Sequence, residues 1–152
     1  MTVIRVLIAD PSPVLRRALV TLLAEDPGFS VVGEASEGFD AVEKARKLRP
    51  DVIILDADLP GLDGLSATQA IMIEAPARVL VLSSERRPGQ KDLASRAREA
   101  GALEVIVARQ GGAADLISFV RKVIESVRLM AEVPVVGRRR GIAAPLREQP
   151  AP

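Results

Sequence analysis

The chain has 152 residues, 48% of them hydrophobic, and a formal net charge of +1. It contains no cysteine and no histidine, which excludes disulfides, cysteine zinc sites and serine–histidine catalysis within these residues. There is no signal-peptide pattern, and no apolar run approaches the roughly 20 residues that span a bilayer. We therefore expect a cytoplasmic chain without a membrane segment.

Short apolar segments rich in β-branched residues alternate along the chain with amphipathic segments of helical period. After the first apolar segment, Ser12 is a suitable N-cap and Pro13 suits the first helical position. The predicted strands cover residues 3–9, 30–35, 51–55, 78–82 and 103–107. The predicted helices cover residues 13–25, 38–48, 64–74, 90–100 and 111–130. Five repeats of strand then helix predict an α/β fold, a parallel sheet with helices on both faces.

The last part of the chain differs in composition and charge. Residues 137–152 carry four arginines against one glutamate, a net charge of +3, so the preceding residues carry −2. Proline and glycine recur here and the apolar periodicity stops after residue 134. We predict a folded domain over residues 1–131 and a Pro- and Arg-rich linker or disordered tail over residues 132–152.

Three acidic residues follow predicted strands: Asp10 after the first, and Asp56 and Asp58 after the third. Neighbouring parallel strands would place Asp10 and Asp56 in one crevice at the carboxyl edge of the sheet. Mg²⁺ prefers such oxygen ligands, and Asp56 could then accept a phosphoryl group while Ser83 donates to a phosphoryl oxygen. The alternative is that these acids only cap backbone N–H groups of loops.

Residues 3–130 resemble the CheY-like receiver domain of two-component response regulators. The matching segments are VLIADPSPVLRRAL, VVGEASEGFDAVEKARKLRPDVIILDADLPGLDGL, RVLVLSS and REAGA. The resemblance implies a flavodoxin-like three-layer sandwich, with a five-stranded parallel sheet in order 2-1-3-4-5 and five helices. It also implies that Asp56 is the phospho-acceptor, Ser83 the switch hydroxyl, and Asp10 the first acid of the metal-binding pair.

The chain departs from the family pattern at three positions. Pro11 replaces the second acid, which in the family is a magnesium ligand. Ala108 stands where the family has a lysine that contacts the phosphoryl group, and Val105 stands at the switch aromatic. A strand bulge would be needed for Arg109 to substitute for that lysine, because successive strand residues face opposite sides.

A weakened Mg²⁺ site would then consist of Asp10, Asp56 and the backbone carbonyl of Asp58. Two functions follow. In the first, the chain is a pseudo-receiver, a regulatory module that binds proteins without phosphorylation. In the second, it is a phospho-accepting receiver switched at Asp56 by a histidine kinase. We favour the first because Pro11 has no side-chain oxygen, and in neither is the chain an enzyme beyond assisting its own phosphorylation and dephosphorylation.

Segments IMIEAPARVLVLSS and RLMAEVPVVGRRRG resemble the receiver half of chemotaxis protein-glutamate methylesterases. The segments IRVLIAD and VVGEASEG also resemble receivers of helix-turn-helix transcription factors, but we favour the methylesterase type. No glycine-rich serine nucleophile segment follows, so the hydrolase domain of that type is absent from these residues.

The expected partners are a histidine kinase or another signalling protein, together with an output domain or a second copy. The family's face for such contacts is formed by the fourth helix, fifth strand and fifth helix, and the fourth helix is basic. Around Leu129, Met130 and Val133 we expect the last helix to extend beyond the core. Nucleic acid binding through Arg138–Arg140 is a third hypothesis that we do not favour, since no aromatic residue accompanies these arginines.

Overall fold

The structure, a computed structural model, describes residues 2–84, 90–108 and 113–137. The strands are β1 (Ile4–Ala9), β2 (Phe29–Ala35), β3 (Val52–Asp56), β4 (Arg78–Ser84) and β5 (Glu104–Ala108). The helices are α1 (Pro13–Ala24), α2 (Gly38–Leu48), α3 (Gly64–Glu74), α4 (Gln90–Ala100) and α5 (Ala113–Met130). Of these helices, none within the described ranges combines the length and apolarity that crossing a membrane requires.

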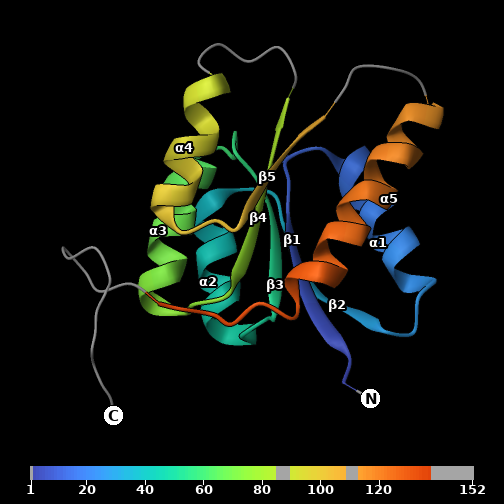
Figure 1. Ribbon diagram of the computed structural model, residues 1–152, viewed down its shortest axis with the longest axis horizontal. Coiled ribbons are helices and arrows are strands. Elements are labelled where there is room, and N and C mark those ends of the chain that lie inside the picture. Colours follow the sequence, from blue (N-terminus) through green and yellow to red (C-terminus); the bar gives the residue numbers. More distant parts are fainter. Residues whose placement is uncertain (1, 85–89, 109–112, 138–152) are drawn as a thin grey trace.

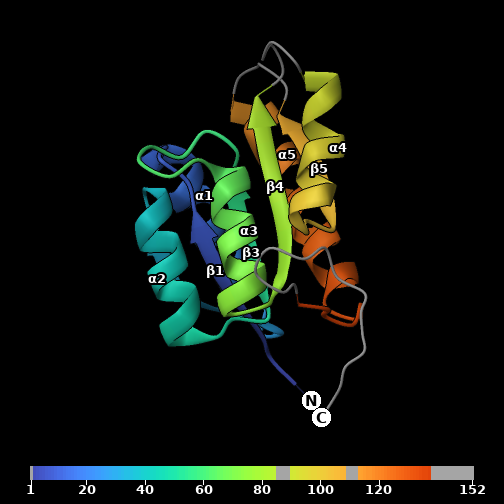
Figure 2. The same cartoon turned by 90° about the vertical axis from the view of Figure 1, so that its left-hand side faces the viewer.

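The five strands form one parallel sheet in the order β2-β1-β3-β4-β5. Helices α1 and α5 cover one face of the sheet, and α2, α3 and α4 cover the other (Figures 1 and 2). This arrangement confirms the predicted three-layer sandwich, its strand order and its five helices. The carboxyl ends of all five strands consequently meet at one edge of the molecule.

Both faces of the sheet are buried, which explains why the strands are apolar almost throughout. In β1, Leu7 and Ala9 pack in the core beneath α2, α3 and α4. Val6 and Ile8 alternate with them and pack in the second core, beneath α1 and α5. All four side chains are fully buried, so a shift of one residue in the register would exchange the two cores.

The predicted ends of three strands shift in a way that matters for the site. Asp56, predicted to begin a loop, is the last residue of β3 and pairs with Leu82. β4 and β5 continue to Ser84 and Ala108, which also pair with each other. The strands therefore carry the candidate residues Asp56, Ser83 and Ala108 on regular, paired backbone.

The expectation that the chain around Leu129, Met130 and Val133 extends beyond the core holds for Leu129 and Val133, which are exposed, but not for Met130. Met130 is only 5% exposed and belongs to the core beneath α1 and α5, whereas Leu129 beside it is 65% exposed. The helical repeat explains the difference, because Met130 falls in line with the buried Val123 and Val127 while Leu129 does not.

Glycines allow the loop after β3 to pass close to its neighbours. A Cβ atom on Gly64, the first residue of α3, would overlap the carbonyl oxygen of Asp56 and lie 2.7 Å from Ala57 Cα. These are backbone atoms, so they cannot move aside without displacing the end of β3. Gly64 thus allows α3 to begin directly against the strand end that carries Asp56.

We predict that Gly64→Ala lowers the free energy of unfolding by about 2–4 kcal/mol, because overpacking against backbone is costly. The measurement is urea denaturation followed by far-UV circular dichroism. Gly28→Ala is the matched control, since its Cβ would meet only the Asp26 side chain at 3.2 Å. Equal losses in the two variants would contradict this account of Gly64.

Candidate functional site

Two acidic side chains come together at the carboxyl ends of β1 and β3. The strands pair with Ala9 opposite Leu55, so Asp10 and Asp56 follow at neighbouring positions. The Asp10 amide donates to the carbonyl of Ala35 at 2.9 Å, which attaches this position to β2 as well. The crevice predicted from strand order is therefore built on three adjacent strands.

The Asp10 carboxyl group is buried, with only 1% of the residue exposed. Its Oδ1 accepts a hydrogen bond from the Ser12 amide at 2.8 Å. Its Oδ2 is also buried. When Asp10 and Asp56 are both ionised, no group among the described residues donates a hydrogen bond to this oxygen. A buried carboxylate oxygen without a donor is costly, so this atom needs a proton or a cation.

The neighbouring Asp56 determines how that need is met. The pKa of Asp10 is raised from its ordinary value of 3.8 to about 7, chiefly because the group is buried, while the Ser12 amide opposes the rise by stabilising the anion. The negative charge of Asp56 and a hydrogen bond between the two carboxyl groups contribute to the same rise. Such a bond requires one proton on the pair, and that proton would also satisfy Asp10 Oδ2.

Asp56 is held by the start of the loop that follows it. Its Oδ1 accepts a hydrogen bond from the Asp58 amide at 2.6 Å. Asp58 itself is exposed, and its amide rather than its carboxylate makes this contact. This hydrogen bond caps a backbone N–H group of the loop, as the alternative hypothesis for these acids expects. The other carboxylate oxygen of Asp56, Oδ2, takes no part in this bond.

The residues present fit a magnesium ion with few protein ligands. Mg²⁺ is commonly bound by one or two carboxylates, with waters and phosphate oxygens completing its shell. Asp10 and Asp56 would supply the carboxylates, and the Asp58 carbonyl remains the predicted third oxygen. Within the described part of the chain no group of three or more His, Cys, Asp or Glu residues converges as a metal site.

Pro11 occupies the exposed position next to Asp10 and offers no side-chain oxygen to a cation. The residue after it begins the cap of α1: Ser12 Oγ accepts from the Leu15 amide at 3.2 Å. The loop is ordered by these hydrogen bonds and by Pro13 at the first position of the helix. The backbone geometry of the site is thus built without the missing acid.

Ser83 lies near the end of β4 and is 2% exposed. Its hydroxyl donates to the Ser84 carbonyl at 3.4 Å, which is at the long limit for a hydrogen bond. The hydroxyl is therefore weakly held. A small rotation about its side-chain bond would redirect it, as a switch hydroxyl requires.

The strand β5 supplies no charge at the two family positions. Val105 is partly buried and packs against the core beneath α2, α3 and α4. Ala108 ends β5 opposite Ser84 and carries only a methyl group. Arg109, the candidate substitute for the lysine, lies outside the described residues.

One functional contact was missed by the sequence analysis. The Arg16 guanidinium donates to the carbonyl of Asp10 at 2.6 Å and pairs with Glu34 at 3.3 Å. Its positive charge lowers the pKa of Asp10, but less than burial and Asp56 raise it. The sequence signal for this contact is an arginine one turn into the helix that follows Asp10. Its spacing alone does not distinguish it from an arginine whose side chain lies in solvent.

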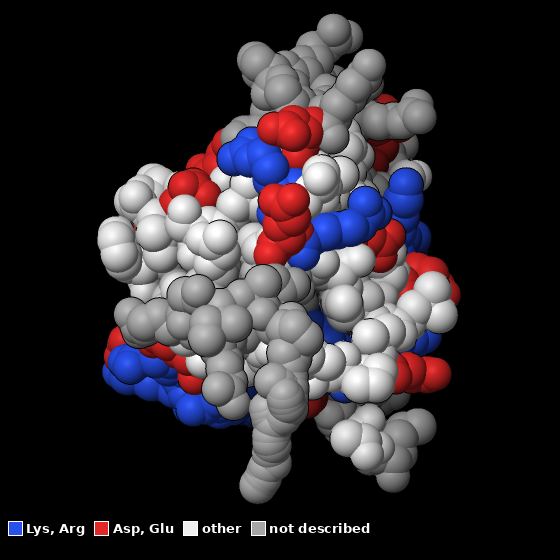
Figure 3. All heavy atoms as spheres, turned by 60° about the vertical axis from the view of Figure 1, so that its left-hand side comes forward, with Lys and Arg blue, Asp and Glu red and all other residues white. Residues whose placement is uncertain are grey.

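The basic character of the α4 region is visible only in part. Arg96 and Arg98 are exposed, whereas Arg86, Arg87 and the side chain of Lys91 lie outside the described residues. Among the coloured residues in Figure 3, acidic and basic side chains are interleaved. This view therefore offers no extended single-sign surface to a nucleic acid backbone.

Comparison with known proteins agrees with this geometry. The family model described as "response regulator receiver domain" matches residues 6–121. Protein-glutamate methylesterase/protein-glutamine glutaminase 3 of Myxococcus xanthus is 48% identical over 144 residues, covering 93% of this chain and 41% of that protein. A second such protein of M. xanthus, numbered 4, is 41% identical over 151 residues, covering 98% and 42%. The chain thus spans about two-fifths of these relatives.

Solved structures show the same fold. The response regulator domain of Thermotoga maritima CheB superposes with a TM-score of 0.79 at 35% identity, covering 87% of this chain and 98% of that one. The receiver domain of the putative response regulator NarL from Mycobacterium tuberculosis gives a TM-score of 0.67 at 28% identity, with coverage of 84% and 98%. The chain belongs to the response regulator receiver domain family, and within it is similar to the receivers of CheB-type methylesterases.

Proposed function

We propose that this receiver is a regulatory protein-binding module whose phosphotransfer chemistry at Asp56 is impaired. The observation that carries the proposal is the composition of the site. Two carboxyl groups, Asp10 and Asp56, meet there, while Pro11 and Ala108 supply neither the third carboxylate nor the ammonium of the family pattern. Phosphoryl transfer depends on such charges to stabilise the transferring group.

The protonation of Asp10 adds to the impairment. Burial and the neighbouring Asp56 raise the pKa of Asp10 to about 7, so the pair keeps a proton more readily near neutral pH than two ordinary carboxylates would. A proton and a divalent cation compete for the same carboxylates, so proton binding weakens metal binding. The third carboxylate would favour the metal in this competition, and Pro11 removes it.

One observation favours the second candidate, a phospho-accepting receiver. No group in the part of the chain that the structure describes donates to the buried Asp10 Oδ2, a position suited to a cation ligand, and Asp56 and Ser83 remain in place. The loss of one acid and one lysine also leaves the formal charge of the site equal to that of the family pattern.

In this candidate, Asp56 attacks phosphorus, the bond to the donor breaks, and Ser83 donates to a phosphoryl oxygen. A bound Mg²⁺ would neutralise charge on that group.

The relatives indicate what such a module could regulate. They are named as methylesterases, and the chain matches only part of their length. We therefore place it as the receiver of a methylesterase-type response regulator in chemotaxis-like signalling, without hydrolase activity of its own.

A histidine kinase or another signalling protein is the proposed partner. The proposed contact face lies on α4, β5 and α5, where Val107 of β5 and Ile117 of α5 are exposed.

Of the two predictions that follow from this proposal, the first concerns stability and pH. The raised pKa of Asp10 means that the folded protein keeps a proton between about pH 4 and pH 7 that the unfolded chain has released. The contribution of Asp10 to the free energy of unfolding is therefore greatest below pH 4 and falls as pH rises to 7. The total loss is at most about 4 kcal/mol, since one pKa unit corresponds to about 1.36 kcal/mol.

The control for this measurement is Asp10→Asn, whose amide does not titrate but can still accept from the Ser12 amide and donate to Asp56. Asp26 and Asp63 have pKa values lowered chiefly by backbone hydrogen bonds to Gly28 and Ser66, and they affect both proteins equally. The expected result is that urea denaturation shows Asp10→Asn gaining stability relative to the wild type from pH 4 to 7. Parallel curves would contradict a raised pKa.

The second prediction concerns phosphorylation. Incubation with acetyl phosphate and Mg²⁺ should give little adduct on the wild type by intact-mass spectrometry. The double variant Pro11→Asp/Ala108→Lys restores the missing charges and should give at least about tenfold more adduct, since single electrostatic groups in such sites contribute at least this much. Pro11→Ala is the matched control, because it relieves the backbone restraint without adding a ligand.

Asp56→Ala identifies the modified residue in this experiment. A substantial adduct on the wild type that disappears in Asp56→Ala would reject the pseudo-receiver proposal and establish the second candidate. The same comparison with a histidine kinase as donor tests whether a dedicated partner compensates for the missing charges.

A further inference from the structure

The chain does not leave the domain where its last helix ends. After α5, the amides of Glu132 and Val133 donate to Leu129 and Met130 carbonyls at 3.3 and 2.9 Å, which closes a turn. Residues 132–137, here called the strap, then run beneath the sheet from α5 towards the lower end of α3 (Figures 1 and 2). This path crosses the amino ends of the central strands.

Arg78, the first residue of β4, holds the strap by its backbone. The Arg78 Nε–H donates to the Val133 carbonyl at 2.6 Å. The same side chain donates through Nη1 to the Asp51 carbonyl at 3.3 Å. Asp51 in turn accepts the Arg5 amide through Oδ2 at 2.9 Å, so Arg78 connects the strap to the base of β1 and β3.

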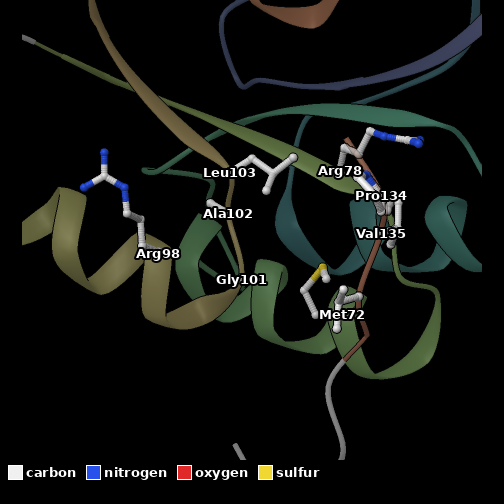
Figure 4. A pocket seen from close by; sticks show the side chains of 10 residues that line it. Met72, Arg78, Arg98, Gly101, Ala102, Leu103, Pro134 and Val135 are labelled. Carbon is white, nitrogen blue, oxygen red and sulfur yellow. The ribbon is translucent and has the colours of Figure 1, made fainter. Parts of the chain in front are cut away.

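Apolar contacts continue along the strap. Pro134 and Val135 line a cavity of about 340 Å³ together with Met72 of α3 and Leu103 before β5 (Figure 4). Gly137 lies so close to the body of the domain that a Cβ atom would come within 2.7 Å of Pro76 Cγ. The strap is therefore packed at both ends, by Arg78 near its start and by Pro76 at its finish.

The packing of the strap is incomplete. Val135 is 37% exposed and Val136 is 67% exposed, and the described residues leave the cavity beside them open. Figure 4 shows the guanidinium groups of Arg78 and Arg98 at opposite ends of this cavity and turned away from each other, so they do not form a common anion site. The geometry suits a weakly docked segment better than a ligand site.

We infer that the base of the sheet is a docking site for the strap, held by Arg78, and that this contact directs the following chain out beside α3. This exit lies at the amino ends of the strands, opposite the edge that carries Asp10 and Asp56. A domain attached after residue 137 would begin there rather than at the end of α5. The inference stands whether or not Asp56 accepts a phosphoryl group.

The test uses the full 152-residue chain, which has no cysteine, so that Val136→Cys gives a single site for a nitroxide spin label. Val136 is exposed enough to carry the label without entering the core. The expected spectrum shows restricted motion in the otherwise wild-type chain and free motion after Arg78→Ala. Arg17→Ala, which alters an exposed arginine of α1, is the matched control and should leave the motion restricted.

A double-mutant cycle provides an independent readout. Gly137→Val should raise the unfolding equilibrium constant about tenfold, equivalent to about 1.4 kcal/mol. In the Arg78→Ala background the same change should cost less than about twofold, because residues that share one contact network are not additive. A mobile label in the otherwise wild-type chain, or an equal cost of Gly137→Val in both backgrounds, would overturn the inference.

Discussion

Burial of a parallel sheet on both faces is the constraint from which the rest of this structure follows. Side chains in the middle of β1, β3 and β4 lie between two helical layers and are apolar. Polar and charged groups are restricted to the strand ends. The acidic pair therefore lies at the carboxyl edge of the sheet, and the Arg78 contact lies at the amino edge.

The electrostatics at the carboxyl edge depend on the burial of Asp10. A carboxylate that is 1% exposed and next to a second carboxylate cannot remain ionised at low cost. A proton, a divalent cation or a cationic side chain can relieve that cost. The family pattern uses a cation and a lysine, whereas Pro11 and Ala108 leave this chain with the proton or a weakly held cation. The protonation of the pair is consequently coupled to any cation that these carboxyl groups bind.

The two edges of the sheet are connected by the same strands. β3 runs from the vicinity of Asp51 to Asp56, and β4 runs from Arg78 to Ser83 and Ser84. The strap contact and the acidic site are therefore held at opposite ends of two paired, rigid elements.

The sequence by itself determined the ten elements, their order and the approach of Asp10 to Asp56, because period, N-caps and parallel strand order are local or topological properties. It also identified the missing charges at Pro11 and Ala108. Only the tertiary structure decided that Asp10 Oδ2 has no donor within residues 2–84, 90–108 and 113–137, that Arg16 reaches the Asp10 carbonyl and that Arg78 holds residues 132–137. These depend on side-chain burial and on contacts between residues far apart in the chain, which no local pattern encodes.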